Sequence, residues 1–252
     1  MTVHERAEFA AIIPARYESS RLPGKVLADI AGKAMIHHVV DRVEAAQLFD
    51  IVLVATDDQR VIDYCADHGI KCTMTSSSHH SGTDRIAEAA QSLPHKYIVN
   101  VQGDEPFISV VALKAICDQL SHPTVHICTL STEITETEYL LDYNVVKLIY
   151  AADGRVLYFS RQAIPAQRDV KYSDWLSHAK YYRHLGIYGF EKQTLLEVVR
   201  LPQSTLEKTE SLEQLRWLEN GYQLYATNVA DNGLAVDTEA DLALARSIMK
   251  NL

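Results

Sequence analysis

The alternation of two kinds of segment constrains the fold more than any other feature of this sequence. Short uninterrupted apolar runs predict strands, and they lie at residues 9–13, 51–55, 71–74, 97–101 and 125–130. Apolar residues at helical spacing predict helices at residues 35–49, 59–68, 84–93 and 110–120. Strands without a polar face are typical of parallel sheets with both faces covered. We therefore expect an α/β fold with a mainly parallel sheet flanked by helices.

The pattern changes after about residue 140. Two apolar segments, residues 145–150 and 155–159, flank the pair Asp153-Gly154, which is typical of a β-hairpin. A further strand is predicted at residues 182–190. Helices are predicted at residues 206–220 and from about residue 239 onward. The second half therefore adds an antiparallel insertion to the parallel sheet.

We expect the 252 residues to form one domain, because no linker, repeat or low-complexity segment divides them. Hydrophobic residues make up 47% of the chain, which is enough for a large core. The expected core covers about residues 9–140 and 205–252, and the expected antiparallel lobe covers about residues 141–204.

The net charge of the chain limits the partners that it can bind. It has 24 Lys and Arg against 33 Asp and Glu, a formal net charge of −9. Such a chain is a poor general binder of nucleic acid or anionic membranes, so cations for an anionic ligand must be gathered locally. The sequence has no apolar run of membrane-spanning length, and its first residues lack the apolar core of a signal peptide. We therefore expect a cytoplasmic protein.

Cysteine and histidine usage does not indicate a metal centre. The four cysteines form no C-x-x-C pair, and we expect buried thiols in a reducing compartment at Cys65, Cys72, Cys117 and Cys128. The two pairs of adjacent histidines lack an accompanying thiolate or HExxH pattern, which disfavours a zinc site.

The loop after the first strand is stiff and cationic. Ligands of open parallel sheets bind at the carboxyl ends of the strands, where this loop begins. It carries Arg16, Arg21 and Lys25, and its prolines and Gly24 restrict its path. Such a loop can bring cations together on phosphate groups. The alternative is a solvated surface loop, and the absence of Ser or Thr after Lys25 excludes the usual phosphate-loop motif.

A carboxylate pair follows the strand at residues 97–101. Asp104 and Glu105 come directly after it, between Gly103 and Pro106. A carboxylate at this edge of the sheet is well placed to hold Mg²⁺ bridging phosphate oxygens. The alternative is a polar turn closed by a side-chain hydrogen bond.

Three further segments have both a functional and a structural interpretation. Small residues near Ser81 permit close approach of a ligand, but Ser81 and Asp84 also match a capping box. Glu213 and Gln214 lie off the leucine stripe of the predicted helix 206–220, so they can bind a ligand. Ser211 and Gln214 also match a capping box. For Asp237, which precedes the last predicted helix, the pattern alone favours a helix cap.

Eight motifs lie between about residue 11 and residue 246, namely IPARYESSRLPGK, VATDD, SGTDR, VNVQGDEP, LYFSR, RHLGIYGF, ESLEQLR and VDT. In this order and spacing they resemble a known enzyme family, the 3-deoxy-manno-octulosonate cytidylyltransferases or CMP-Kdo synthetases. Departures include Leu234, Ala235 and Glu239 around the VDT motif, where the family usually has Pro, Gly and Pro.

The resemblance implies a nucleotidyltransferase fold and a reaction. CMP passes from CTP to the anomeric C2 hydroxyl of 3-deoxy-manno-octulosonate, pyrophosphate leaves, and the product serves lipopolysaccharide biosynthesis. Mg²⁺ is the implied cofactor. The implied assembly is a homodimer with the antiparallel region at its interface. Two alternatives stay open: the same chemistry on a modified sugar such as 8-amino-3,8-dideoxy-manno-octulosonate, or a silent binding protein that kept the fold.

The resemblance also implies roles for individual residues. The implied nucleotide-binding residues are Arg16, Arg21, Lys25, Ser81, Gly82, Thr83 and Gln102. The implied catalytic residues are Arg16, Lys25, Asp104 and Asp237, of which the two aspartates are the implied Mg²⁺ ligands. The implied sugar-binding residues are Gln102, Arg161, His184, Tyr188, Glu213 and Gln214.

Overall fold

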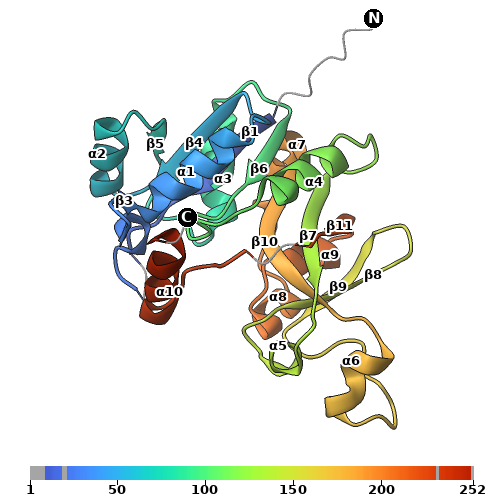
Figure 1. Cartoon of the computed structure of the whole chain (residues 1–252). Helices are drawn as coiled ribbons and strands as arrows, with labels where there is room; N and C mark the ends of the chain where they lie inside the picture. Colours follow the sequence, from blue (N-terminus) through green and yellow to red (C-terminus); the bar gives the residue numbers. More distant parts are fainter. Residues whose placement is uncertain (1–8, 19–21, 231–232, 251–252) are drawn as a thin grey trace, which may run out of the picture.

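The computed structural model of the chain describes residues 9–18, 22–230 and 233–250 (Figure 1). Within these residues, a nine-stranded sheet contains seven strands in the order β11-β7-β10-β6-β1-β4-β5, and β8 and β9 extend it beside β10. The sheet strands are β1 (Phe9–Pro14), β4 (Ile51–Thr56), β5 (Cys72–Met74), β6 (Tyr97–Asn100), β7 (Ile127–Glu133), β8 (Lys147–Tyr150), β9 (Val156–Ser160), β10 (Tyr182–Glu191) and β11 (Leu224–Asn228).

The parallel half of the sheet is confirmed. Strand β1 lies between β4 and β6 and is parallel to both, and β5 is parallel to β4. All residues of β1 and β6 are buried, because helices cover both faces of the sheet. The carboxyl ends of β1, β4 and β6 therefore lie at one edge, as the apolar runs predicted.

Strand β10 lies inside the main sheet. It pairs antiparallel with β6 on one side and with β7 on the other, and its register shifts between Leu185 and Tyr188. Strand β11 is parallel to β7 at the sheet edge. Part of the segment expected in the lobe at residues 141–204 thus belongs to the central sheet.

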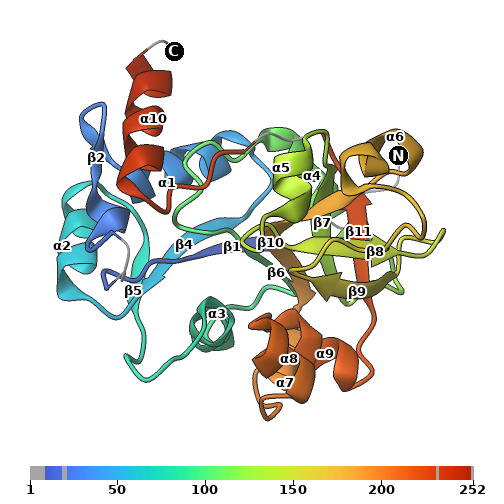
Figure 2. The ribbon, with the colours of Figure 1, turned by 90° about the horizontal axis from the view of Figure 1, so that it is seen from below.

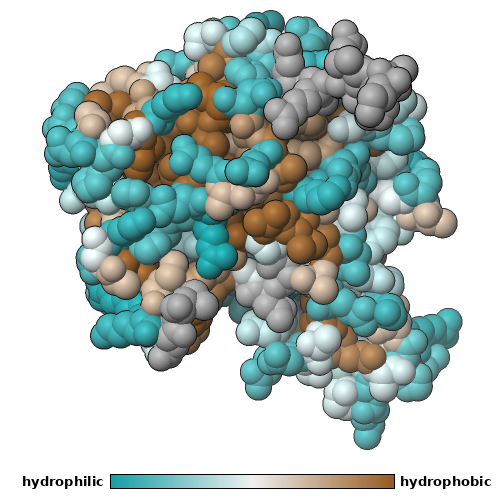
Figure 3. Space-filling model, turned by 45° about the horizontal axis from the view of Figure 1, so that its top comes forward, coloured by the Kyte–Doolittle hydropathy of each residue, from teal (hydrophilic) through white to brown (hydrophobic). Residues whose placement is uncertain are grey.

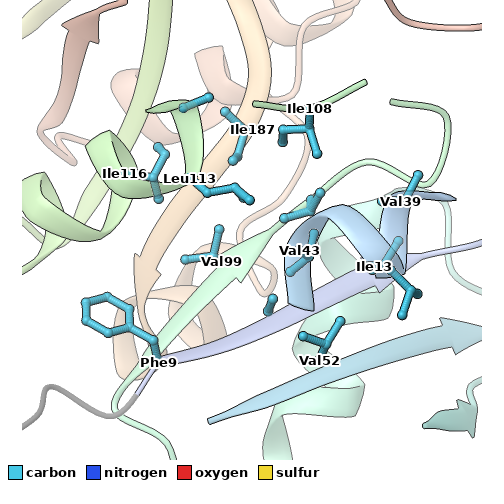
Figure 4. Packing of buried hydrophobic residues seen from close by; sticks show 14 of the residues in the cluster. Phe9, Ile13, Val39, Val43, Val52, Val99, Ile108, Leu113, Ile116 and Ile187 are labelled. Carbon is cyan, nitrogen blue, oxygen red and sulfur yellow. The ribbon is translucent and has the colours of Figure 1, made fainter. Parts of the chain in front are cut away.

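Helices form a layer on each face (Figure 2). Helices α1 (Met35–Ala45) and α4 (Val110–Leu120) lie on one face, while α3 (Gly82–Gln91), α7 (Lys192–Val198) and α9 (Gln214–Glu219) lie on the other. Side chains of α1, α4, β1 and β6 point toward one another in the first layer (Figure 4). The second layer buries Ile12, Ile98 and Trp217 among others. The helix predicted at 35–49 ends at Ala45.

A small lobe protrudes at the lower right of Figure 3. It contains α5 (Thr137–Leu141), the 3₁₀ turn η2 (Tyr172–Asp174) and α6 (Trp175–His178). The lobe has its own apolar cluster, made of Ile134, Leu140, Trp175 and Tyr181. No helix in the described parts of the chain has the length and apolar character needed to cross a membrane.

The single helix predicted at residues 206–220 is wrong. Two helices form instead, α8 (Thr205–Glu210) and α9, because Ser211 adopts a left-handed backbone with φ 54°. A capping box of Ser204 and Glu207 starts α8, and the box expected from Ser211 and Gln214 does not form. The buried Arg216 guanidinium donates to both carboxylate oxygens of Glu207, at 2.6 and 2.8 Å. This ion pair fastens α9 to α8.

Several short elements escaped the sequence patterns. They are η1 (Lys25–Leu27), β2 (Asp29–Ile30), β3 (Lys33–Ala34), α5, α6, α7 and β11. Most of them are too short for a period to show. Helix α2 (Gln59–Asp67) and the last helix, α10 (Glu239–Lys250), lie where they were expected. All four cysteines are free thiols, and Cys72 is the one that is only half-buried.

Gly189 of β10 lets helix α4 pack closely on the sheet. A Cβ at this position would lie 2.8 Å from Cys128 Sγ and 3.1 Å from side-chain carbons of Ile116 and Leu120. Because β10 also carries His184 and Tyr188, this packing fixes the strand on which those side chains stand.

We expect Gly189→Ala to lower the free energy of unfolding by about 1–3 kcal/mol, because the added methyl group overpacks a buried contact. Urea unfolding followed by circular dichroism measures the loss. The double variant Gly189→Ala/Cys128→Ala should lose less than the sum of the two single losses, since removing the sulfur makes room for the methyl group. Strictly additive losses would contradict this packing.

Candidate active site

A cavity of about 330 Å³ opens at the carboxyl ends of β1 and β6. It is built from four segments that are distant in sequence: the β1–η1 loop, the start of α3, the β6–α4 loop and the segment before α10. The lining residues are Pro14, Arg16, Glu18, Lys25, Val26, Gly82, Gln102, Gly103, Asp104 and Asp237. Gly103 is required here, because a Cβ would lie 2.8 Å from the Pro14 carbonyl oxygen.

Lys25 joins two carboxylates in this cavity. Its ammonium group donates to Asp104 Oδ2 at 2.6 Å and to Asp237 Oδ1 at 2.9 Å. The backbone reinforces the junction, since the Val236 amide donates to the Asp104 carbonyl at 2.9 Å. Burial lowers the pKa of Lys25, but the two carboxylates outweigh this effect and raise its pKa overall. The lysine therefore stays charged and holds the two chain segments together.

Asp237 is not the cap of α10. Thr238 takes that position, since its Oγ1 accepts from the Asp241 amide at 3.2 Å and its own amide donates to Asp241 Oδ2 at 2.8 Å. The helix-cap interpretation of Asp237 is therefore wrong. The Asp237 carboxylate instead reaches the cavity, where it meets Lys25.

The two aspartates suit a hard cation. Mg²⁺ prefers oxygen ligands and is commonly held by one or two carboxylates together with water and substrate phosphates. Asp104 and Asp237 already converge on one positive charge, the Lys25 ammonium. In the parts of the chain that the structure describes, no group of three or more His, Cys, Asp and Glu side chains converges to hold a metal. The donor set thus fits a cation that completes its coordination with substrate and water.

Arg16 supplies the second cation of the cavity. Its Nη2 donates to the His79 carbonyl at 3.0 Å, and the side chain is half-buried. Burial, followed by the charge of Arg85, lowers the pKa of Arg16. An arginine so placed gains from an anionic ligand, because an anion replaces the lost hydration. Arg21, the third cation of the loop, lies outside the described residues.

Beneath Arg16 lies a buried polar network that sequence reasoning missed. The fully buried Arg85 donates to Thr75 Oγ1 at 2.5 Å and to Asp57 Oδ2 at 2.8 Å. Asp57 directly follows β4, just as Asp104 stands just beyond β6, so its place at a strand end was an available signal. His79 had no such signal, because its contribution is a backbone carbonyl.

The segment Ser81–Thr83 serves two sides of the site. Ser81 caps α3 and forms a capping box with Asp84, so the structural interpretation of this pair is confirmed. Gly82 lines the cavity. Thr83 is buried, and its hydroxyl donates to Glu213 Oε2 at 2.5 Å, away from the set of cavity-lining residues.

Gln102 connects the cavity to strand β10. Its Nε2 donates to the Gly186 carbonyl at 3.1 Å, at the register shift of β10. On the same strand, the rings of His184 and Tyr188 lie 5.2 Å apart. Burial lowers the pKa of His184 to about 3 and raises the pKa of Tyr188 far above its ordinary value. Both side chains are therefore neutral at ordinary pH.

Glu213 and Gln214 lie at the start of α9 and complete the group that contains Gln102, His184 and Tyr188. Gln214 is buried, and Glu213 lies close enough to raise the pKa of Tyr188 further. Burial raises the pKa of Glu213, while bonds from Thr83 and Ser81 and the charge of Arg216 oppose that rise. The structure thus brings Gln102, His184, Tyr188, Glu213 and Gln214 into one region beside the cavity.

Arg161 is bound to the chain segment that precedes Glu213. Its guanidinium donates to the backbone carbonyls of Glu210, Tyr143 and Ser211, at 2.6, 2.9 and 3.2 Å. Its backbone amide donates to Glu210 Oε2 at 2.9 Å. These bonds tie the end of β9 to the turn between α8 and α9, so the side chain acts here as a structural clamp.

Comparison with known proteins identifies the family. A family model described as cytidylyltransferase matches residues 10–227. A 3-deoxy-manno-octulosonate cytidylyltransferase of Bacteroides thetaiotaomicron is 42% identical over 249 residues, which cover 97% of this chain and 99% of the relative. A solved CMP:2-keto-3-deoxy-manno-octonic acid synthetase complexed with CTP has a TM-score of 0.91 at 37% identity, with 97% of this chain and 99% of that chain covered.

A more distant solved structure is similar to this chain in fold alone. The 4-diphosphocytidyl-2C-methyl-D-erythritol synthase of Anaerococcus prevotii has a TM-score of 0.63 at 14% identity, with 97% of this chain and 99% of that chain covered. At this identity the likeness shows a shared fold alone. The chain belongs to the cytidylyltransferase family and, within it, to the 3-deoxy-manno-octulosonate cytidylyltransferases.

Proposed function

We propose that this chain transfers CMP from CTP to the anomeric C2 hydroxyl of 3-deoxy-manno-octulosonate. A bond forms between the C2 oxygen and the α-phosphorus, and the bond from the α-phosphorus to the oxygen bridging to the β-phosphate breaks. Pyrophosphate leaves, and the hydroxyl proton passes to solvent. The observation that carries the proposal is the cavity in which Arg16 and Lys25 lie with Asp104 and Asp237, next to Gln102.

The cationic side of the cavity suits the triphosphate. In the proposal, the half-buried Arg16 donates charge-assisted hydrogen bonds to phosphate oxygens, and Lys25 adds a point charge. Transfer of a phosphoryl group requires mainly positioning and charge neutralisation, so no covalent enzyme intermediate is needed. When bound by Asp104 and Asp237, Mg²⁺ neutralises charge on the triphosphate.

The region on β10 and α9 suits the sugar. A polyhydroxylated acid needs neutral donors and acceptors, and His184 and Tyr188 are neutral because they are buried. His184 Nε2 is hydrogen-bonded to Thr129 Oγ1 at 2.9 Å, which orients the ring. Gln102 joins this region to the nucleotide cavity through Gly186, so the C2 hydroxyl would meet the α-phosphorus near Gln102.

We also propose a cytoplasmic homodimer that associates through the lobe and feeds lipopolysaccharide synthesis. Free thiols at all four cysteines suit a reducing compartment. The lobe exposes large apolar side chains, namely Tyr139, Leu141, Tyr143 and Tyr172, each at least 46% exposed. Exposed apolar groups of this size support an interaction surface. Analytical ultracentrifugation of the parent and of Tyr143→Glu would test the dimer.

The direct test of the reaction is pyrophosphate release with CTP, Mg²⁺ and a panel of ulosonic acids. The proposal requires turnover with 3-deoxy-manno-octulosonate, at a higher kcat/KM than with its 8-amino analogue. No release with any sugar of the panel, from a folded protein that binds CTP, would contradict it.

We expect Arg16→Ala to lower kcat/KM for CTP by one to two decades, because a charge-assisted bond to phosphate contributes about 1.5–3 kcal/mol. The melting temperature should stay near that of the parent, since Arg16 makes one backbone hydrogen bond in the structure. Arg155→Ala removes an exposed arginine outside the cavity and serves as the matched control. Unchanged CTP kinetics in Arg16→Ala would refute its role as a phosphate clamp.

We expect Asp237→Asn to have the melting temperature of the parent. Its kcat should fall on the order of a thousandfold, because charge stabilisation of the transition state by a metal contributes several kcal/mol. Asparagine keeps the shape but lacks the charge that holds a hard cation. Raised Mg²⁺ or added Mn²⁺ should restore part of the activity. Asp118→Asn changes an exposed surface aspartate and controls for the loss of one charge. Near-parental activity of Asp237→Asn at ordinary Mg²⁺ would show that this carboxylate holds no metal.

We expect Gln214→Ala to raise the KM for the sugar about tenfold and to leave the KM for CTP within about twofold, because the proposal makes the amide of the buried Gln214 a sugar ligand. Gln193→Ala on the exposed face of α7 is the control for a lost glutamine. Steady-state kinetics with each substrate varied in turn measure both constants. Equal changes in the two KM values would argue against the assignment.

A further inference from the structure

Thr83 belongs to the segment Ser81–Thr83 that the resemblance assigns to nucleotide binding, yet its side chain contacts another part of the site. Its side chain is 4% exposed, and it is absent from the residues that line the nucleotide cavity. Its neighbour Gly82 does line that cavity. The first turn of α3 thus presents its backbone to the nucleotide side and the Thr83 hydroxyl to the opposite side.

The partner of Thr83 is the carboxylate of Glu213. Thr83 Oγ1 donates to Glu213 Oε2 at 2.5 Å, across 130 residues of sequence. This distance is typical of a hydroxyl bound to a charged carboxylate. The bond joins α3, which starts at the nucleotide cavity, to α9, which starts at the group proposed to bind the sugar.

Few other groups hold the Glu213 side chain. As the N-cap residue of α9 it makes no side-chain capping bond. Arg216 Nη2 lies 3.7 Å from Glu213 Oε1, but the Arg216 guanidinium already donates to both carboxylate oxygens of Glu207. Removing the Thr83 hydroxyl would therefore leave the Glu213 carboxylate with only the weaker bond from Ser81 and the charge of Arg216 to hold it.

The second oxygen of Glu213, Oε1, is buried, and none of the described residues hydrogen-bonds it, although Arg216 Nη2 lies 3.7 Å away. The same holds for the hydroxyl of Tyr188, on the neighbouring strand β10. Buried polar atoms without partners are costly, and a bound polar molecule can satisfy them. A bound ligand with hydroxyl groups would satisfy the unpartnered oxygen of Glu213 and the unpartnered hydroxyl of Tyr188.

We propose that Thr83 is a positioning residue for the sugar: it holds Glu213 Oε2 so that Glu213 Oε1 can accept from a sugar hydroxyl. This inference rests on the proposed function, because it takes Glu213 as a sugar ligand. It assigns Thr83 to the sugar side of the reaction, whereas the motif alone assigned it to the nucleotide side.

The surroundings of Glu213 supply a second readout. Burial raises its pKa, and hydrogen bonds from Thr83 and Ser81 and the charge of Arg216 act against this rise. The carboxylate of Asp84 raises the pKa, and the neighbouring Tyr188 is neutral. Loss of the Thr83 hydroxyl must then raise the pKa of Glu213 further. The acid limb of the pH profile would move to higher pH, because only the ionised carboxylate can accept at both oxygens, one from residue 83 or Ser81 and the other from the sugar.

The test compares Thr83→Val with Thr83→Ser. Valine keeps the shape and removes the hydroxyl, so we expect the KM for 3-deoxy-manno-octulosonate to rise about tenfold while the KM for CTP stays within about twofold. The acid limb of kcat/KM for the sugar should move to higher pH. Serine should recover most of the loss. Thr194→Val, at a buried threonine of α7 outside the site, controls for the substitution itself.

A double variant tests the coupling. Thr83→Val should add little to the effect of Glu213→Ala, because the alanine variant already removes the carboxylate that Thr83 holds. A KM for CTP that rises as much as the KM for the sugar, or full additivity with Glu213→Ala, would overturn the proposal.

A measurement without turnover separates this proposal from the proposed function. The ¹³C signal of the Glu213 carboxyl group, assigned with Glu213→Gln, reports its pKa in the free protein. Thr83→Val should raise that pKa, and Thr83→Ser should not. An unchanged pKa overturns the positioning role even if the parent is active. A parent that releases no pyrophosphate overturns the proposed function, whatever the pKa. If Thr83→Val does not fold, Thr83→Ala takes its place, because it also removes the hydroxyl, and an unchanged Glu213 pKa in Thr83→Ala overturns the positioning role.

Discussion

The contact of one ammonium group with two carboxylates organises the site. Lys25 comes from the loop after β1, Asp104 from the loop after β6, and Asp237 from the segment before α10. Apolar packing also holds these segments, because Val236 is buried in a cluster with Ile30 and Met35, and the backbone bond between Val236 and Asp104 adds to it. A ligand that binds together with Mg²⁺ would weaken the bonds of Lys25 to Asp104 and Asp237, because Mg²⁺ and the ammonium group compete for the same carboxylate oxygens.

The antiparallel strand in the middle of the sheet explains how one domain can serve two substrates. Strand β10 enters between β6 and β7, so His184 and Tyr188 stand beside the end of β6, where Gln102 begins the next loop. A purely parallel sheet would place only loops at this edge. Here a strand supplies buried neutral side chains next to a charged cavity, which suits the proposed reaction between a polyanion and a sugar.

Much of the fold followed from local pattern, because buried parallel strands leave continuous apolar runs that are easy to detect. The prediction of Asp104 at the sheet edge succeeded for the same reason, since a strand end is visible in one dimension. The helix at residues 206–220 was wrong because the leucine stripe continues across Ser211, whose left-handed backbone breaks the helix. Arg161 shows the opposite limit: its residue type suits a carboxylate ligand, but three backbone carbonyls take its donors.

The sequence by itself determined the fold class, the family and the residue types available for chemistry, because apolar periodicity and ordered motifs are properties of one dimension. Only the tertiary structure decided how those residues pair. It brought Asp237 to Asp104 instead of to a helix end, turned Thr83 from the nucleotide to Glu213, and placed β10 inside the sheet. Such pairings depend on which buried polar group finds a partner at hydrogen-bonding distance, and that is settled by packing across many residues, not by spacing along the chain.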